Sequence, residues 1–510
     1  MTARGTAPNV LFIIVDQMSH FVLPIEQPGF RPASQCAAVA PNIAALARSG
    51  KVFTNCYTAS PLCAPARASI ATGQHVRHHR VCTNGDEFSA SIPTWMHGLQ
   101  AAGYRTTVSG KTHAVGPDQL HGFDDRQTTD IYPSDFIWSR DWRDPVVHDP
   151  GTSVDKLEVS GVCRTNMQIN YDTEAKNRAV EFLQDHALGG DGRPFGLMLS
   201  FTQPHEPFQT LEKYWDRYRD EDVQEPVRAD SGDGEAHPYN RMLQTYHGVD
   251  RNRPDRERTR GSIRAHLGMI SHLDDYIGEV LSTLDTLGMR DDTVIIFTSD
   301  HGEMLGAHGM WFKRTFYEES AHVPLIMSWP GHIEPGVCAE VVSHVDLAPT
   351  ILDLADAKDR DGFLDADGAS LKTLLIDGSD PDWRGHAMID YFGDGTNTPM
   401  FMLRNGPWKA VAFLDFPPLL FNLDDDPFEA ENLADVPEHS ARLRSMCDEI
   451  FRDFDARAFT EQVMKAQRAR IAIQSGRNRS ASRVIAWDYS PSVDGTSRYV
   501  RTALNVSDSK

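Results

Sequence analysis

The sequence lacks an excess of positive charge, a long hydrophobic run near its start and a regular arrangement of cysteines. Its 510 residues include 50 Lys and Arg against 72 Asp and Glu, which gives a net charge of −22. Proteins that bind nucleic acids or anionic membrane surfaces need a basic face, so this balance excludes both kinds of partner. The apolar run from Val10 to Val15 is too short for a secretory signal or a membrane span, and we expect a cytoplasmic protein.

The cysteines do not form a recognisable framework. There are 7 of them, an odd number, scattered from Cys36 to Cys447, which matches neither a disulfide scaffold nor a zinc-binding CxxC pair. The composition is 40% hydrophobic and 24% charged, which is ordinary for a globular protein, so the chain should fold around a substantial core. Its length favours one large domain with a smaller one beside it.

Two apolar, β-branched segments predict strands that are buried on both faces of a parallel sheet. They cover residues 9–15 and 293–299, and they run directly into Asp16 and Asp300. Helical patterns occupy residues 42–49, 92–102, 173–186 and 262–287. This alternation predicts an α/β fold with a mostly parallel central sheet sandwiched by helices. Ligands bind beyond the carboxyl ends of such strands, so both aspartates are expected at a site.

The pattern changes in two other regions. Residues 212–260 are polar and charged, and we expect a long irregular surface insertion there. Short apolar pieces at 387–391, 400–404, 408–413 and 419–423 predict a small antiparallel sheet, and 437–470 should be helical. We therefore expect a large α/β domain over 1–375 that carries the site, a smaller C-terminal α+β domain over 376–470 and a tail over 471–510.

The segment from Ser60 to Ser69 carries the most informative motif. Cys63 follows a proline-containing turn and begins a predicted helix, and Arg67 comes four residues later. A helix N-terminus and a fixed cation both favour an anion at that place. On these residues alone, however, a buried structural cysteine is the commoner case.

Cys63-x-Pro65-x-Arg67, followed by Ser69 and by Thr72-Gly73, resembles the signature of the formylglycine-dependent type I sulfatases, a group within the alkaline phosphatase superfamily. The resemblance implies an alkaline phosphatase-like fold and a formylglycine made from Cys63 by a formylglycine-generating or other sulfatase-maturation enzyme. It also implies one divalent metal ion, whose ligands are Asp16, Gln17, the group derived from Cys63, Asp300 and His301. Oxygen-rich ligands favour calcium, with manganese or magnesium as alternatives.

Other positions match residues that contact the sulfate or the leaving oxygen in this family, namely Asn84, Lys111, His113, His205 and Lys313. The resemblance implies that Arg67, Lys111 and Lys313 clamp the sulfuryl oxygens. It also implies a mechanism in which one hydroxyl of hydrated formylglycine attacks sulfur, and a covalent sulfoenzyme forms as the alcohol leaves with a proton from His205 or His113. In that mechanism the second hydroxyl then loses its proton to His113 and expels sulfate.

Within the family, residues 116–123, 128–135 and the terminal 487–501 resemble the choline sulfatase branch. The resemblance implies that Trp138 faces a trimethylammonium group and that Asp394 assists it. From the residues alone, a packing tryptophan and a turn aspartate are the alternatives. Residues 144–151 are shorter and poorer in aromatics than the branch carries, with His148 as a stand-in for its pocket histidine, so an aryl or alkyl sulfatase fits equally well.

Two other functions remain open. A phosphonate monoester or phosphodiester hydrolase of the same superfamily shares the Asp-Gln and Asp-His pairs, and a non-catalytic anion-binding protein could retain the fold. For a sulfatase, the expected partners are a small-molecule sulfate ester and further copies of the chain. Tails in the choline branch pack across subunits, so the resemblance implies a homo-oligomer, most simply a tetramer built from dimers.

Overall fold

The computed structural model describes residues 7–25, 37–141, 152–219, 221, 223–224, 226, 237–357, 363–479 and 487–490. The expectations for His148 and for residues 491–501 lie outside this part of the chain. Among the described helices, none is both long and apolar enough to cross a membrane.

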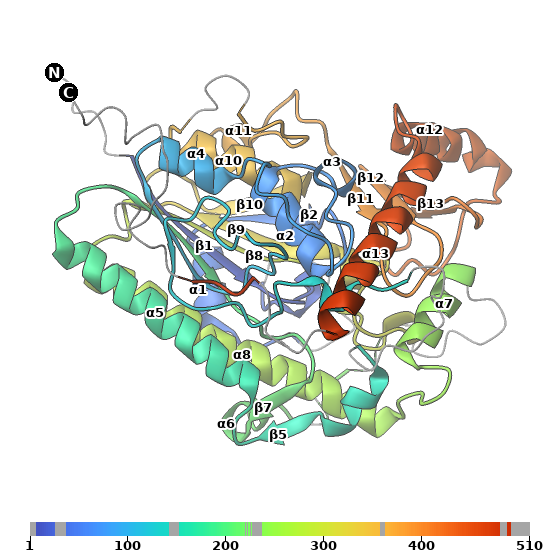
Figure 1. Ribbon diagram of the computed structural model, residues 1–510, viewed down its shortest axis with the longest axis horizontal. Helices are drawn as coiled ribbons and strands as arrows, with labels where there is room; N and C mark the ends of the chain where they lie inside the picture. The colour runs from blue at the N-terminus through green and yellow to red at the C-terminus, as the bar shows by residue number, and fades with distance from the viewer. Residues whose placement is uncertain are drawn as a thin grey trace.

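A central sheet of eight strands organises the larger part of the molecule (Figure 1). In spatial order, its strands are β10 (Gly336–Ser343), β2 (Lys51–Tyr57), β9 (His322–Ser328), β8 (Thr293–Ser299), β1 (Asn9–Val15), β6 (Phe195–Ser200), β3 (Arg105–Gly110) and β4 (Asp125–Arg126). Strand β9 runs antiparallel to both neighbours, and the other pairs are parallel. The predicted mostly parallel sheet is confirmed, and the two strands expected from sequence lie next to each other inside it.

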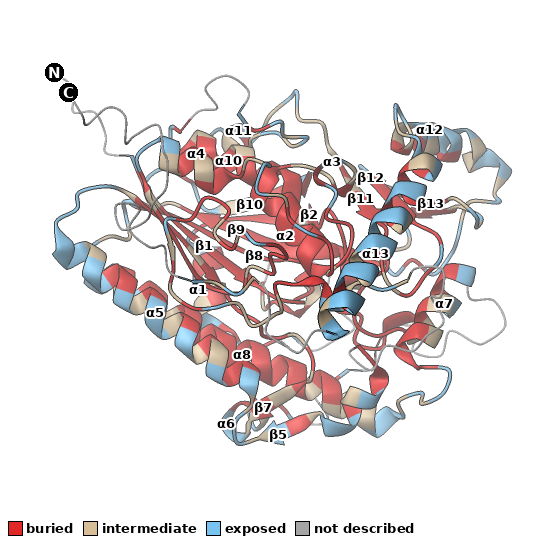
Figure 2. Ribbon diagram, in the orientation of Figure 1, coloured by how far each residue is buried: buried red, intermediate tan, exposed pale blue. Residues whose placement is uncertain are grey.

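Helices cover both faces of this sheet. One face packs against α1 (Pro41–Arg48), α5 (Met167–Gly189) and α8 (Arg256–Thr286), and the other against α2 (Cys63–Thr72), α4 (Trp95–Ala101), α10 (Leu347–Leu354) and α11 (Lys372–Ile376). Strand β1 is apolar from Val10 to Val15 because helices cover the sheet on both faces. Leu11 and Ile13 lie in one core cluster and Val10 and Phe12 in the other, because successive side chains of a strand point to opposite faces. Figure 2 shows the buried sheet and the exposed outer sides of the long helices.

A second, antiparallel sheet follows in sequence. It consists of β11 (His386–Tyr391), β12 (Met400–Asn405), β13 (Trp408–Phe413) and β14 (Leu419–Asn422), as the short apolar pieces predict. Two helices, α12 (Ser440–Ile450) and α13 (Ala456–Arg479), share a core cluster with it. The domain boundaries at 375 and 470 stay predictions.

The expectation of an irregular insertion over residues 212–260 is wrong for its described part. Two helices, α6 (Glu212–Trp215) and α7 (Pro238–His247), lie in it, and α8 already begins at Arg256. Helix α7 is polar on one side only. Tyr239 and Leu243 on its other side are buried in the cluster shared with the second sheet, so the charged composition conceals an amphipathic helix.

Further short elements include α3 (Val76–His79), α9 (Glu318–Ala321), β5 (Gly161–Cys163), β7 (Gln209–Leu211) and a 3₁₀ turn, η2 (Phe136–Trp138). Strands β5 and β7 form a separate two-stranded sheet.

Candidate active site

The two acidic strand ends meet at one edge of the central sheet. Strands β1 and β8 are paired in register up to Val15 and Ser299, so Asp16 and Asp300 emerge side by side. The backbone amides of Gln17 and His301 donate to Asp300 Oδ1 at 3.1 and 2.9 Å. The pairs Asp16-Gln17 and Asp300-His301, which the sequence predicts at one site, are therefore joined by a direct hydrogen bond.

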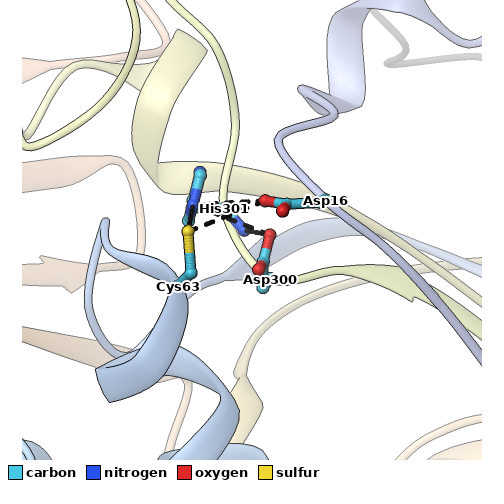
Figure 3. A group of neighbouring side chains, drawn as sticks. All are labelled: Asp16, Cys63, Asp300 and His301. Carbon is cyan, nitrogen blue, oxygen red and sulfur yellow. Dashed lines mark hydrogen bonds and ion pairs between the residues drawn. The ribbon is translucent and has the colours of Figure 1, made fainter. Parts of the chain in front are cut away.

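Four of the expected metal ligands gather here (Figure 3): one potential ligand atom from each of Asp16, Cys63, Asp300 and His301 lies within 4.8 Å of the others. Cys63 is the first residue of α2, and its Sγ is 3.2 Å from His301 Nε2 and 3.7 Å from Asp16 Oδ1. His301 Nδ1 lies 3.0 Å from the carbonyl oxygen of Gly302. The proton of a neutral ring therefore sits on Nδ1, which leaves the lone pair of Nε2 facing the group.

The charges of this group suit a cation. Burial raises the pKa of Asp16, but Lys111 and further cations outweigh it and hold that pKa well below its usual value. Burial and Asp16 raise the pKa of Asp300, whereas His301 and Arg67 bring it below the usual value. Two buried carboxylates that both stay ionised, beside an imidazole lone pair, fit a divalent ion.

Gln17 lies at the same edge, held by other side chains. Its Nε2 donates to Glu206 Oε2 at 2.8 Å and to Glu303 Oε2, and its Oε1 accepts from the ammonium of Lys313. Two carboxylates thus fix the amide so that its oxygen faces Lys313. The amide oxygen of Gln17 has a second lone pair with which it could also bind an ion. The role of Gln17 as a metal ligand stays a prediction.

Three buried cations, Arg67, Lys111 and Lys313, surround the group of metal ligands. Arg67 donates from Nε to Asp300 Oδ2 at 2.8 Å, and from Nη1 to Lys111 O at 3.0 Å and Ser200 Oγ at 2.8 Å. Its Nη2 is buried without a hydrogen-bond partner among the described residues. Lys111 pairs with Asp16 and is fully buried. An orphaned guanidinium nitrogen is costly unless an acceptor arrives, so this place favours an anion.

A cavity of about 350 Å³ opens above Cys63. Its lining includes the sequence-predicted residues Asn84, His113, Trp138, His205, Lys313 and Asp394. Asn84 Oδ1 accepts from Ala64 N at 3.0 Å, so this side chain also caps the start of α2. The structure therefore brings the predicted residues to one pocket, from segments spread over most of the chain.

Two histidines in the pocket differ in their surroundings. His205 Nδ1 lies 2.8 Å from the carbonyl oxygen of Glu206, and its Nε2 lies 2.7 Å from Lys313 Nζ. Neither ring nitrogen of His113 has a hydrogen-bond partner in the described chain. Burial, and then Lys111, lower the pKa of His113 well below its usual value, so this imidazole is neutral at neutral pH.

Part of the cavity wall is aromatic. The rings of Tyr132 and Trp138 lie 4.8 Å apart, and His113 stacks on Tyr132 at 4.6 Å. Asp394 also lines the cavity, with Oδ2 3.9 Å from Arg314 Nη2.

Sequence reasoning missed Tyr132, Glu206, Glu303 and Arg314. Tyr132 stands inside the segment 128–135, and Glu206 directly follows the predicted His205. Sequence reasoning also missed that His79 is buried and lies 2.9 Å from Ser69 Oγ. Nothing in its local sequence signals that contact.

Comparisons with known proteins agree with this geometry. The family model described as Sulfatase matches residues 8–357, and the one described as N-sulphoglucosamine sulphohydrolase, C-terminal, matches residues 306–454. A choline-sulfatase of Rhizobium meliloti (strain 1021) is 37% identical, over 98% of this chain and 96% of the relative. An arylsulfatase of Clostridium perfringens (strain 13 / Type A) is 28% identical, over 88% and 95%. The crystal structure of a phosphonate monoester hydrolase of Agrobacterium radiobacter superposes with a TM-score of 0.70 at 26% identity, over 89% of this chain and 96% of that one.

Proposed function

The chain belongs to the sulfatase family, and from that premise we propose that this sulfate ester hydrolase acts on choline O-sulfate or a closely similar monoester. The observation that carries the proposal is the lining of the pocket. Cys63 of the metal-ligand group and the cation Lys313 line it together with the aromatic residues Tyr132 and Trp138 and the carboxylate of Asp394.

The base of the pocket suits a sulfate group. Arg67 offers the unpartnered Nη2, and the ammonium groups of Lys111 and Lys313 lie beside Asp16 and Gln17. Fixed cations in a buried site stabilise the charge that develops on sulfuryl oxygens more strongly than they would in water. These three side chains therefore orient the ester and stabilise its transition state.

The aromatic part of the wall suits a quaternary ammonium group. The ring faces of Tyr132 and Trp138 attract a desolvated cation, and Asp394 adds a negative charge. The identity to the choline-sulfatase of Rhizobium meliloti supports this assignment. An aryl sulfate, stacked on the same wall, is the alternative substrate.

Asp16, Asp300 and His301 would hold the divalent ion together with the group derived from Cys63, with Gln17 as a further ligand. Calcium is our first choice because two carboxylates supply the charge, and manganese or magnesium are the alternatives. The ion, when bound, acts as a Lewis acid toward the sulfate oxygens. Formylglycine at position 63 supplies the nucleophilic hydroxyl of a hydrated aldehyde, and a maturation enzyme has to produce it from the cysteine.

The histidines divide the proton transfers. His205 Nε2 and Lys313 Nζ share a hydrogen bond at the pocket surface, so this pair is placed to protonate the leaving alkoxide. His113 is neutral and has two uncommitted ring nitrogens, which suits the base that accepts a proton before sulfate is released. Glu206 O fixes the tautomer of His205 through Nδ1.

Replacing Trp138 by Leu tests the substrate assignment. For choline O-sulfate we expect KM to rise about tenfold with little change in kcat, because a cation–π contact is worth about 0.5–2 kcal/mol. For 4-nitrophenyl sulfate we expect less than about a threefold change. Trp408→Leu, on β13 outside the pocket lining, is the matched control. If the wild type prefers the aryl ester, the choline assignment is wrong; if it prefers a phosphodiester, the sulfate ester assignment fails.

We also propose a cytoplasmic homo-oligomer, a tetramer built from dimers, in which the tail from residue 471 contributes to assembly. These proposals rest on the choline-branch resemblance of the chain. Mass spectrometry of the peptide that contains Cys63 measures the extent of its conversion.

A further inference from the structure

We propose that Asp130 is a positioning residue for sulfate ester hydrolysis, which fixes the segment carrying Lys111 and His113 against the aromatic wall of the pocket. The inference rests on the reaction that the family establishes and does not depend on choline as the substrate.

One carboxylate group gathers the hydrogen bonds of two loops. Its Oδ2 accepts from Thr112 N and Thr112 Oγ1, both at 2.7 Å, and from His113 N at 2.8 Å. Its Oδ1 accepts from Tyr132 N at 3.1 Å. The first loop follows β3, and the second carries the turn toward Trp138. The two loops follow the paired strands β3 and β4, and they meet again farther on, where Gly116 N donates to Ser134 O at 2.8 Å. Between these two points, the carboxylate connects the backbone of Thr112 and His113 to that of Tyr132.

The side chain of Asp130 is buried in its ionised form. It is only 5% exposed, and Arg126 Nη2 lies 3.4 Å from its Oδ2. Burial raises the pKa of Asp130, but the charge of Arg126 and the hydrogen bonds from Thr112 outweigh it, and the net pKa lies below the usual value. Arg126 also donates from Nη1 to Thr112 Oγ1 and from Nη2 to Gly110 O, so it supports the same loop from behind.

The loop needs this support because its conformation is unfavourable. His113 has a φ of 58°, in the left-handed region that costs a non-glycine residue about 1 kcal/mol or more. The hydrogen bond from its amide to Asp130 holds it there. Without it, the backbone could relax and turn the imidazole out of the pocket.

The two loops together determine how close Lys111 and His113 lie to Tyr132. Lys111 Nζ lies 4.3 Å from the ring centre of Tyr132, and the His113 ring stacks on the same tyrosine. We assign Lys111 and His113 to the sulfate group and Tyr132 to the leaving group. A carboxylate that bonds Thr112, His113 and Tyr132 together therefore fixes these side chains relative to one another.

Asp130→Asn tests the proposal, because it keeps the size of the side chain and removes one charged acceptor. On the better substrate of the wild type, we expect kcat to fall about 30- to 300-fold with a change in KM of less than about threefold, since catalysis is sensitive to a misplacement of about 1 Å. Asp130→Glu, which restores the charge, should recover part of the lost kcat. Thr112→Val, which removes a single donor, should cost about 3- to 10-fold.

Asp124→Asn is the matched control. Asp124 Oδ2 accepts from Thr106 N at 2.9 Å, the same kind of bond, but at the opposite end of β3 from the pocket. We expect it to keep wild-type kcat even where its Tm falls. Wild-type kcat in both Asp130→Asn and Thr112→Val, or a loss of kcat in Asp124→Asn as large as that in Asp130→Asn, would overturn the proposal. If Asp130→Asn does not fold, Thr112→Val and Asp130→Glu decide the question. The substrate preference of the wild type tests the proposed function separately.

Discussion

Arg67 Nε donates a 2.8 Å hydrogen bond to Asp300 Oδ2. The arginine comes from the helix that begins at Cys63, and the aspartate ends strand β8, so this bond ties the motif helix to the metal-ligand edge of the sheet. With Nη1 bonded to Lys111 O and Ser200 Oγ, the guanidinium is oriented before any ligand arrives. An anion that binds Nη2 therefore pays little entropy for ordering the side chain.

Arg67→Lys should lower kcat/KM for sulfate esters about 10²- to 10³-fold, because an ammonium cannot make the three-sided set of bonds and still face the ligand. Steady-state kinetics on the purified protein checks this. Arg77→Lys is the control, since Arg77 makes a comparable buried pair with Asp390 away from the pocket, with Nε 2.8 Å from Oδ2. Equal losses in the two variants would mean that Arg67 acts only through stability.

Removal of divalent ions should abolish activity and lower Tm, because Asp16 and Asp300 would then repel each other without a bound cation. An ion present at about 100 times its Kd stabilises the fold by about 2.7 kcal/mol, enough to detect by calorimetry. Dialysis against a chelator, followed by calcium, manganese or magnesium, ranks the ions. Full activity and an unchanged Tm in the chelated protein would argue against the metal site.

Glu319 should make the protein less stable as the pH rises. Burial, and then Glu429, raise the pKa of Glu319 to about 8, compared with 4.5 for an ordinary glutamate. The folded state thus binds this proton more tightly. Its contribution to stability is complete below about pH 4.5 and is lost as the pH rises through about 8.

Glu319→Gln, which mimics the protonated acid, should therefore lose less Tm than the wild type between about pH 6 and pH 9. Thermal unfolding across this range checks the difference. The exposed Glu340→Gln should follow the wild type. A parallel pH dependence in Glu319→Gln would show that this carboxyl group is not the one that titrates.

Truncation after Arg470 should weaken both assembly and activity. It removes Arg477, whose guanidinium lies 5.9 Å from the ring centre of Phe136 and 4.3 Å from that of Trp487. Phe136 begins the turn that ends in Trp138, so the helix end supports the pocket wall as well as the tail. Light scattering and kinetics on the truncated chain check both effects. If the truncated protein keeps the wild-type number of subunits and the wild-type activity, residues 471–510 have no role in either.

The sequence predicts the sheet and the base of the site well, because both depend on local pattern. Unbroken apolar runs mark β1 and β8, and the acidic residues that follow them have to meet once the strands pair in parallel. Helix α7 was missed because its buried face is spread among polar residues. Asp130 could not be identified, since its role comes from a loop 17 to 18 residues earlier in the chain.

The pairing of β1 with β8 also bears on how the chain reaches its active form. The hydrogen bond from Gln17 N to Asp300 Oδ1 joins residues 283 positions apart. Parallel pairing over such a separation is slow, because the entropy of closing a long loop must be lost before the contacts are gained. No N-terminal fragment that stops short of β8 can assemble the ion site. Ion binding can therefore serve as a late marker of refolding, appearing after most helical structure has returned.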